Sequence, residues 1–149
     1  MEIQKRVDVV SIKVVKDYSI KYSPRKVSNP RDAYKLFERF LLDIDREKFL
    51  VACFNTKNEP VNISVVSVGT LNSSLVHPRE VMKTAILSNS NSIMIAHNHP
   101  SGSLAPSEED KKITNRLIQA CEILGIKLLD HIIIGDNDRY FSFKENLLM

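Results

Sequence analysis

The sequence is poor in cysteine and lacks any apolar run long enough to cross a membrane. Its only cysteines are Cys53 and Cys121, and neither belongs to a CxxC pair, so no cysteine-based metal site is indicated. Each lies in an apolar stretch, where a reduced cysteine acts as a small hydrophobe. No apolar run approaches 18 residues, and residues 1–10 lack the layout of a signal peptide. We therefore expect a cytoplasmic protein with no membrane association.

Nothing in the composition signals disorder or a fibrous protein. Of the 149 residues, 43% are hydrophobic and 26% are charged, as in ordinary globular domains. The net charge is only +3, but residues 1–27 contain seven Lys or Arg against three Asp or Glu. This basic segment is a candidate contact for nucleic acid, although alternating lysines on a strand usually form its solvated face.

Strand-like and helix-like patterns alternate along the chain. β-Branched and regularly placed polar residues over 7–22 predict one or two half-exposed strands in an N-terminal extension, residues 1–27. Residues 28–149 then form the expected core domain. Its predicted helices lie within 28–45, 77–88 and 107–125, and its predicted strands within 47–55, 60–69, 92–97, 126–135 and 140–143. This order predicts an α/β domain with a mixed sheet flanked by helices.

Residues 97–110, HNHPSGSLAPSEED, carry the strongest chemical signal. Because side chains alternate along a strand, His97 and His99 point the same way, with Cα atoms about 6 to 7 Å apart. Two imidazoles at this separation can bind one zinc ion. The first turn of the following helix offers three candidates for a third ligand, namely Glu108, Glu109 and Asp110.

The end of this stretch also has a purely structural interpretation. Ser107 and Asp110 have the spacing of a capping box, in which the serine side chain accepts a hydrogen bond from a free backbone N–H. A carboxylate in the first turn is also stabilised by the positive field of the helix start. Neither role needs a metal ion, so both interpretations stay open on these residues alone.

The spacing His97-x-His99-x7-Ser107-x2-Asp110 resembles the JAMM signature of the JAB/MPN metalloprotease superfamily. Residues 70–136, which contain HNHPSG and LLDHIIIGD, are similar to the RadC branch of that superfamily almost from end to end. The resemblance implies a JAB1/MPN domain, a three-layer fold of the cytidine-deaminase-like type. It also implies one zinc ion held by His97, His99 and Asp110, with water in the fourth position.

The resemblance implies catalytic residues as well. In this superfamily a glutamate at the start of the first core strand acts as general base, and the matching position here is Glu47. Glu80 is a rival, but its place at a helix start is well explained by the helix dipole. Ser107 is expected to donate a hydrogen bond to the oxyanion as well as capping the helix. Together these parts imply a zinc-dependent hydrolase that cleaves an amide or isopeptide bond in an unidentified peptide or protein.

Three polar residues elsewhere in the sequence receive lesser roles. His131 lies among aliphatic residues of a predicted strand, so we expect a structural histidine there. Its neighbour Asp130 is a candidate to orient a metal ligand from behind. His77 precedes Pro78 at a helix start and is expected to cap that helix.

Two other functions are alternatives to the hydrolase. The RadC family carries a DNA-repair label, so a non-catalytic role in DNA repair is the alternative. The longer family members have a helix-hairpin-helix region before the JAB domain, and this sequence offers only the short basic segment, which removes the feature that favours DNA binding. An HNH nuclease is excluded because that motif spreads its residues over a ββα unit of about 30 residues or more. The HExxH pattern of the common zinc proteases is absent.

An exposed N-terminal strand can pair with a neighbouring sheet, so a homodimer is a candidate assembly.

Overall fold

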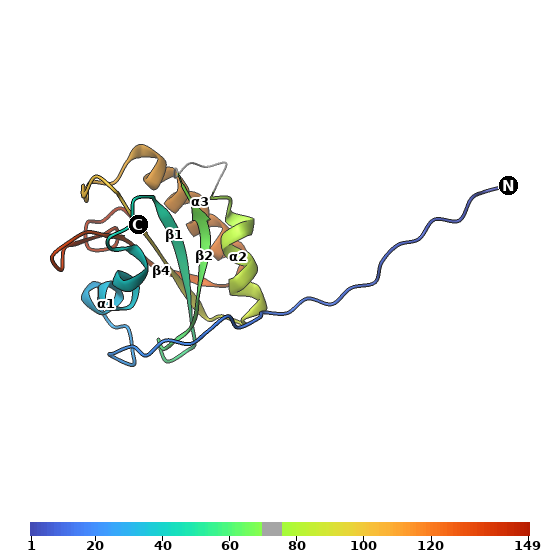
Figure 1. Cartoon of the computed structure of the whole chain (residues 1–149), viewed down its shortest axis with the longest axis horizontal. Helices are drawn as coiled ribbons and strands as arrows, with labels where there is room; N and C mark the ends of the chain where they lie inside the picture. The colour runs from blue at the N-terminus through green and yellow to red at the C-terminus, as the bar shows by residue number, and fades with distance from the viewer. Residues whose placement is uncertain (70–75) are drawn as a thin grey trace.

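The protein folds around one mixed β-sheet (Figure 1). The structure, a computed structural model, describes residues 1–69 and 76–149. Its helices are α1 (Pro30–Leu41), α2 (Pro78–Leu87) and α3 (Glu108–Leu124). Its strands are β1 (Lys48–Phe54), β2 (Pro60–Val68), β3 (Ser92–Asn98), β4 (Lys127–Ile134) and β5 (Tyr140–Ser142). The strand order is β2-β1-β3-β4-β5, and within this sheet only β3 and β4 pair in parallel. These elements confirm the predicted α/β domain with a mixed sheet.

Helices cover both faces of the sheet, which gives three layers. On one face α1 packs its buried side chains against the sheet: Tyr34, Phe37 and Leu41 against Leu50, Ala52, Met94 and Ala96. On the other face α2 and α3 supply a second cluster: Val81, Met82, Ile113 and Leu117 against Phe49, Val51, Ile93 and Ile95. Burying each large apolar side chain contributes about 1.5 to 3 kcal/mol. Because helices cover both sides, β3 is buried along its whole length.

The helix boundaries follow from local capping signals. Asn29 accepts a hydrogen bond from the backbone N–H of Asp32, and Pro30 occupies the first turn of α1. Nδ1 of His77 accepts a hydrogen bond from the backbone N–H of Arg79, which confirms the predicted cap of α2. At the end of α3, Gly125 has a φ of 69°, the left-handed conformation that glycine adopts without strain.

The N-terminal segment differs from the prediction. Residues 1–22 run extended and form no strand, so the expected strands over residues 7–22 are wrong. Residues 1–12 are exposed along their whole length and leave the body of the protein as a tail (Figure 1). Residues 13–20 pass along β2 and α2 and line a groove together with them. A segment with an alternating pattern becomes a strand only where the edge of a neighbouring strand pairs with its backbone. Residues 7–22 form no such pairing.

The connection between β3 and β4 brings the histidine-rich segment to one end of the sheet. In a parallel β-α-β unit the chain leaves the first strand at its carboxyl end, and the helix begins near that end. The last residues of β3 therefore lie beside the first turn of α3. None of the helices in the described part of the chain is long and apolar enough to cross a membrane.

Candidate metal centre

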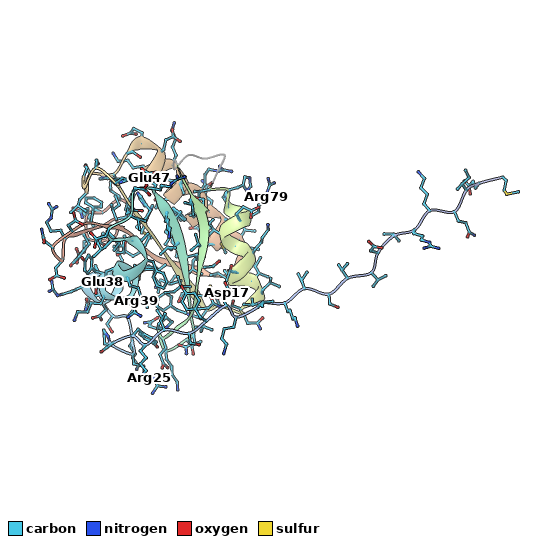
Figure 2. All side chains as sticks on the ribbon, viewed as in Figure 1. Asp17, Arg25, Glu38, Arg39, Glu47 and Arg79 are labelled. Carbon is cyan, nitrogen blue, oxygen red and sulfur yellow. The ribbon has the colours of Figure 1, made fainter. Side chains whose placement is uncertain are left out.

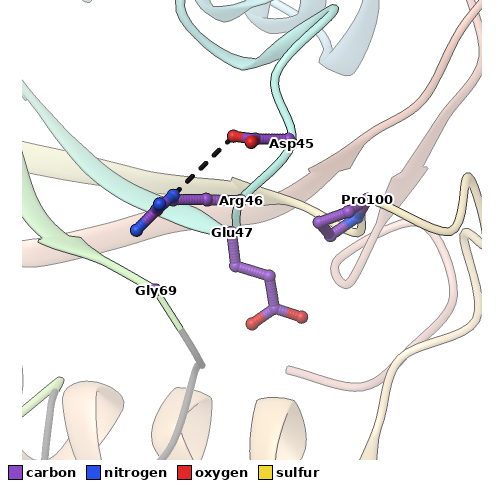
Figure 3. Close-up of a pocket in the computed structure, with 5 residues that line it drawn as sticks. All are labelled: Asp45, Arg46, Glu47, Gly69 and Pro100. Carbon is purple, nitrogen blue, oxygen red and sulfur yellow. Dashed lines mark ion pairs between the residues drawn. The ribbon is translucent and has the colours of Figure 1, made fainter.

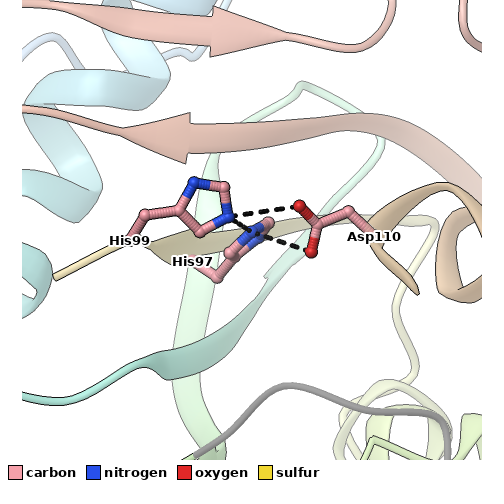
Figure 4. Close-up of side chains that lie close together, drawn as sticks. All are labelled: His97, His99 and Asp110. Carbon is pink, nitrogen blue, oxygen red and sulfur yellow. Dashed lines mark hydrogen bonds and ion pairs between the residues drawn. The ribbon is translucent and has the colours of Figure 1, made fainter. Parts of the chain in front are cut away.

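Three side chains converge where β3 meets α3. His97 projects from the end of β3, His99 follows directly after the strand, and Asp110 projects from the first turn of α3 toward them (Figure 4). Nε2 of His97 lies 3.1 Å from Nε2 of His99 and 3.2 Å from Oδ1 of Asp110. Nε2 of His99 lies 3.2 Å from Oδ2 of Asp110. The structure thus selects Asp110 from the three acidic residues that the sequence offers as a third ligand.

The separations between these atoms fit the size of a metal ion. A tetrahedral zinc ion with bonds of about 2.0 to 2.1 Å holds its ligands about 3.3 Å apart. The observed 3.1 to 3.2 Å is close to that edge length. Among the described residues, His97, His99 and Asp110 form a group that could hold a metal ion.

The hydrogen atoms on His99 also suit a metal ligand. Its Nδ1 lies 2.7 Å from the carbonyl oxygen of Ser103, which can only accept a hydrogen bond. Nδ1 therefore carries a hydrogen, and in the neutral ring Nε2 keeps its lone pair. The side chain of His99 is 12% exposed, whereas His97 is fully buried. The group consequently opens to solvent on the side of His99.

The carboxylate of Asp110 is held in its charged form. Burial raises its pKa, but the close contacts with His97 and His99 and the hydrogen bond from the backbone N–H of Ser107 outweigh burial and hold that pKa well below its usual value. The backbone N–H of Ser107 lies 2.8 Å from Oδ2. The hydrogen bond to Asp110 raises the pKa of His99, and burial opposes that rise. A proton and a cation therefore compete for Nε2 of His99.

Glu47 borders an open pocket that reaches Pro100, the residue after His99. It directly precedes β1, whose residue Phe49 pairs with His97 in antiparallel register. Continuing that register by two residues brings Glu47 opposite His99, on the same face of the sheet. Glu47 also adds to the rise in the pKa of His99, after the larger effect of the hydrogen bond to Asp110.

The pocket itself is an open hollow of about 350 Å³. Its lining includes Glu47, Gly69 and Pro100, the residue that follows His99 (Figure 3). Figure 2 places Glu47 at the opposite end of β1 from Asp17 and Arg25. The N-terminal segment around Asp17 and Arg25 is therefore remote from this pocket.

Comparison with known protein families identifies the domain. The sequence model of the RadC-like JAB domain matches residues 27–148. The chain belongs to this family. It is 52% identical over 87% of its length to a UPF0758 protein of Clostridioides difficile, of which it covers 54%. It is 47% identical over 81% of its length to a UPF0758 protein of Methanosarcina mazei, of which it covers 52%.

A UPF0758 protein of Rubrobacter xylanophilus is 44% identical over 93% of the chain, which covers 61% of that relative. The chain thus spans about half the length of the curated relatives it matches.

The other acidic candidates of this RadC-like JAB domain lie away from the ligands. Glu108 pairs with Lys111 at 3.2 Å, and Glu109 with Lys112 at 3.7 Å, on α3 itself. Glu80 lies in the first turn of α2, 2.8 Å from Lys83. The position of each of these glutamates is therefore explained by its ion pair with a lysine in the same helix.

Ser107 forms the predicted capping box with Asp110. Its hydroxyl oxygen accepts a hydrogen bond from the backbone N–H of Asp110 at 3.0 Å. The residue is exposed. Its hydroxyl hydrogen is not used in the capping box, so it is available to a group that enters from solvent.

The structure places His131, and not Asp130, beside His97. Asp130 accepts hydrogen bonds from the hydroxyl of Ser142 and the backbone N–H groups of His131 and Lys144, away from the metal ligands. His131 instead reaches His97, with 2.7 Å between its Nε2 and Nδ1 of His97. The sequence pattern missed this contact because it depends on the parallel register that sets Ile95 beside His131. Burial holds the pKa of His131 well below its ordinary value, so the ring is neutral.

Proposed function

We propose that this domain is a metal-dependent hydrolase that cleaves amide or isopeptide bonds of peptides or proteins, with zinc as its metal. The observation that carries the proposal is the convergence of His97, His99 and Asp110 beside the pocket lined by Glu47. Two imidazoles and a carboxylate form a ligand set typical of catalytic zinc sites, which leave the fourth position open. When bound, zinc lowers the pKa of a water molecule to about 7 and polarises a carbonyl group.

The residues around the ligands are suited to the rest of the reaction. Glu47 acts as the general base: it removes a proton from the attacking water and delivers that proton to the departing amine. Ser107 donates its free hydroxyl hydrogen to the oxygen that becomes negative in the transition state. Because the pocket lined by Glu47 is open and its lining includes Pro100, the residue after His99, a peptide can enter it from solvent.

Metal content tests the first half of this proposal. Purified protein is expected to contain about one zinc per chain by elemental mass spectrometry, and His97→Ala, His99→Ala and Asp110→Ala are each expected to lose it. Glu109→Gln is the matched control, because Glu109 lies in the same helical turn but pairs with Lys112. Wild-type protein without metal, or variants that keep it, contradict the site.

Turnover tests the second half. Wild-type protein is incubated with a peptide library from a bacterial lysate, and new amino termini are counted by mass spectrometry. Glu47→Gln is expected to keep zinc and to lose cleavage, whereas Glu80→Gln keeps both. If Glu47→Gln cleaves as well as wild type, Glu47 is not the base. If wild-type protein with bound zinc cleaves neither this library nor isopeptide-linked peptides, a binding role replaces the hydrolase.

A further inference from the structure

We propose that Thr114 and His131 form a hydrogen-bond relay that fixes which nitrogen of His97 carries its hydrogen and so prepares His97 for metal. This inference rests on the metal site of the proposed function, but not on the hydrolase reaction. His131 and Thr114 would not touch metal or substrate; they are positioning residues that act through His97.

The relay begins at the backbone carbonyl of Asp110. Oγ1 of Thr114 lies 2.7 Å from that carbonyl oxygen, one helical turn earlier in α3. Two oxygens this close need a hydrogen atom between them, and the only one available is the hydroxyl hydrogen of Thr114. Thr114 has then used its single donor. Its second contact, 2.6 Å to Nδ1 of His131, must be one in which the hydroxyl oxygen accepts.

His131 connects the hydroxyl of Thr114 to His97, and the hydrogen bond from one fixes the hydrogen bond to the other. Its Nδ1 carries a hydrogen, because Thr114 can only accept there. The ring of His131 is fully buried, stacks on Phe143 with centroids 4.4 Å apart, and meets the edge of Phe49 at 5.7 Å. These apolar neighbours disfavour an imidazolium cation, so Nε2 of His131 is an acceptor.

His97 is the last member of the relay. Its Nδ1 lies 2.7 Å from Nε2 of His131 and must donate to it. In the neutral ring, Nε2 of His97 then has no hydrogen, so its lone pair is available to a cation placed between it and Oδ1 of Asp110, 3.2 Å away. His99 reaches the same state by a separate route, through the carbonyl of Ser103. Both histidines thus present the nitrogen lone pairs that a metal ion needs.

If every hydrogen bond of the relay ran in the opposite direction, one close contact would have no hydrogen atom between its two oxygens. If Thr114 donated to His131, the hydrogens would shift so that Nε2 of His97 carried one and could not bind metal. The 2.7 Å contact between Thr114 and the carbonyl of Asp110 would then hold two oxygens with no hydrogen. The hydroxyl of Thr114 therefore sets the direction, and removing it frees His97 to adopt the wrong form.

Thr114→Val tests the relay, because valine has nearly the shape of threonine without the hydroxyl. We expect its affinity for zinc, measured by competition with a chelator, to fall about 10- to 100-fold. We expect Thr114→Ser, which restores the hydroxyl, to recover most of that loss. Ser142→Ala is the matched control: it removes a buried hydroxyl bonded to Asp130, is expected to lower stability, and leaves zinc affinity unchanged.

Nitrogen NMR of the imidazoles in zinc-free protein gives a second readout that a purely structural role would not change. His97 is expected to carry its hydrogen on Nδ1 in wild type and to shift toward Nε2 in Thr114→Val. Unchanged zinc affinity and an unchanged His97 signal in Thr114→Val overturn the relay even if the metal site stands. If wild-type protein binds no zinc, the proposed function fails, while the NMR signals still decide whether the relay exists.

Discussion

The side chain of Asn98 holds the backbone on both sides of Glu47. Its Oδ1 accepts a hydrogen bond from the N–H of Lys48 at 2.8 Å, and its Nδ2 donates to the carbonyl of Arg46 at 2.9 Å. Asn98 stands between the two histidine ligands in sequence, but its side chain alternates away from theirs. Residues 97–99 thus carry two candidate metal ligands and the anchor for the residue that we propose as base.

Asn98→Ala is expected to separate base positioning from metal binding. The variant leaves two backbone groups of the Glu47 segment without their partner, at a cost of about 1 to 3 kcal/mol of unfolding free energy for a buried group. We expect cleavage to fall by about 10²-fold, since a displacement of about 1 Å can have that effect. Zinc content stays at the wild-type level. Loss of zinc together with cleavage contradicts a role confined to Glu47.

Ser107→Ala is expected to remove the helix cap without removing the metal. The lost acceptor for the N–H of Asp110 costs about 1 kcal/mol in urea unfolding. The zinc stays because Asp110 keeps its hydrogen bond from the backbone N–H of residue 107, which alanine retains. If Ser107 also donates to the oxyanion, cleavage falls by about 10²-fold or more. Ser107→Thr keeps the hydroxyl and serves as the control.

Zinc is expected to stabilise the fold. A ligand at 100 times its dissociation constant adds about 2.7 kcal/mol to the free energy of unfolding. For a chain of this length that corresponds to a rise of about 5 to 10 °C in the midpoint of thermal unfolding. Calorimetry of chelator-treated protein before and after addition of zinc measures the shift. Asp110→Asn keeps the size of the side chain and is expected to show no shift, so an equal rise in both proteins contradicts this site.

Both cysteines are expected to resist alkylation in the folded protein. Burial raises the pKa of Cys121 to about 11 and also raises that of Cys53. At pH 8 a thiol with that pKa is ionised in about one molecule in a thousand, and the thiolate is the reactive form. Mass spectrometry after iodoacetamide treatment is expected to show no labelling at pH 8 and full labelling in urea. Rapid labelling of either cysteine without denaturant contradicts its buried position.

The elements that the sequence predicts correctly are those with local signals. Helix α3 has a capping serine at Ser107, an apolar stripe and a terminating glycine at Gly125, and each acts within a few residues. Residues 7–22 have the alternation of a strand, but strand formation also needs a partner edge that lies elsewhere in the sequence. A pattern of side chains does not identify that edge.

The same distinction applies to the site. His97 and His99 are recognisable because alternation along one strand puts them together. Glu47 is predicted by family resemblance alone, and its position opposite His99 follows only from the antiparallel register of β1 with β3. The contact between His131 and His97 depends on the parallel register of β3 with β4 and on stacking of His131 with Phe143. Neither can be predicted from the residues next to His131 in the sequence.

The position of Asp110 in the first turn of α3 has an electrostatic consequence for both halves of the proposed chemistry. The aligned peptide dipoles of a helix give its start a partial positive charge of about half a unit. A cation bound to Asp110 lies in that field, which opposes its binding, and the full negative charge of the carboxylate has to outweigh this opposition. An oxygen that gains negative charge at the same place is stabilised by the same field. Helix α3 thus weakens the attraction for the cation while strengthening the electrophilic character of the site around it.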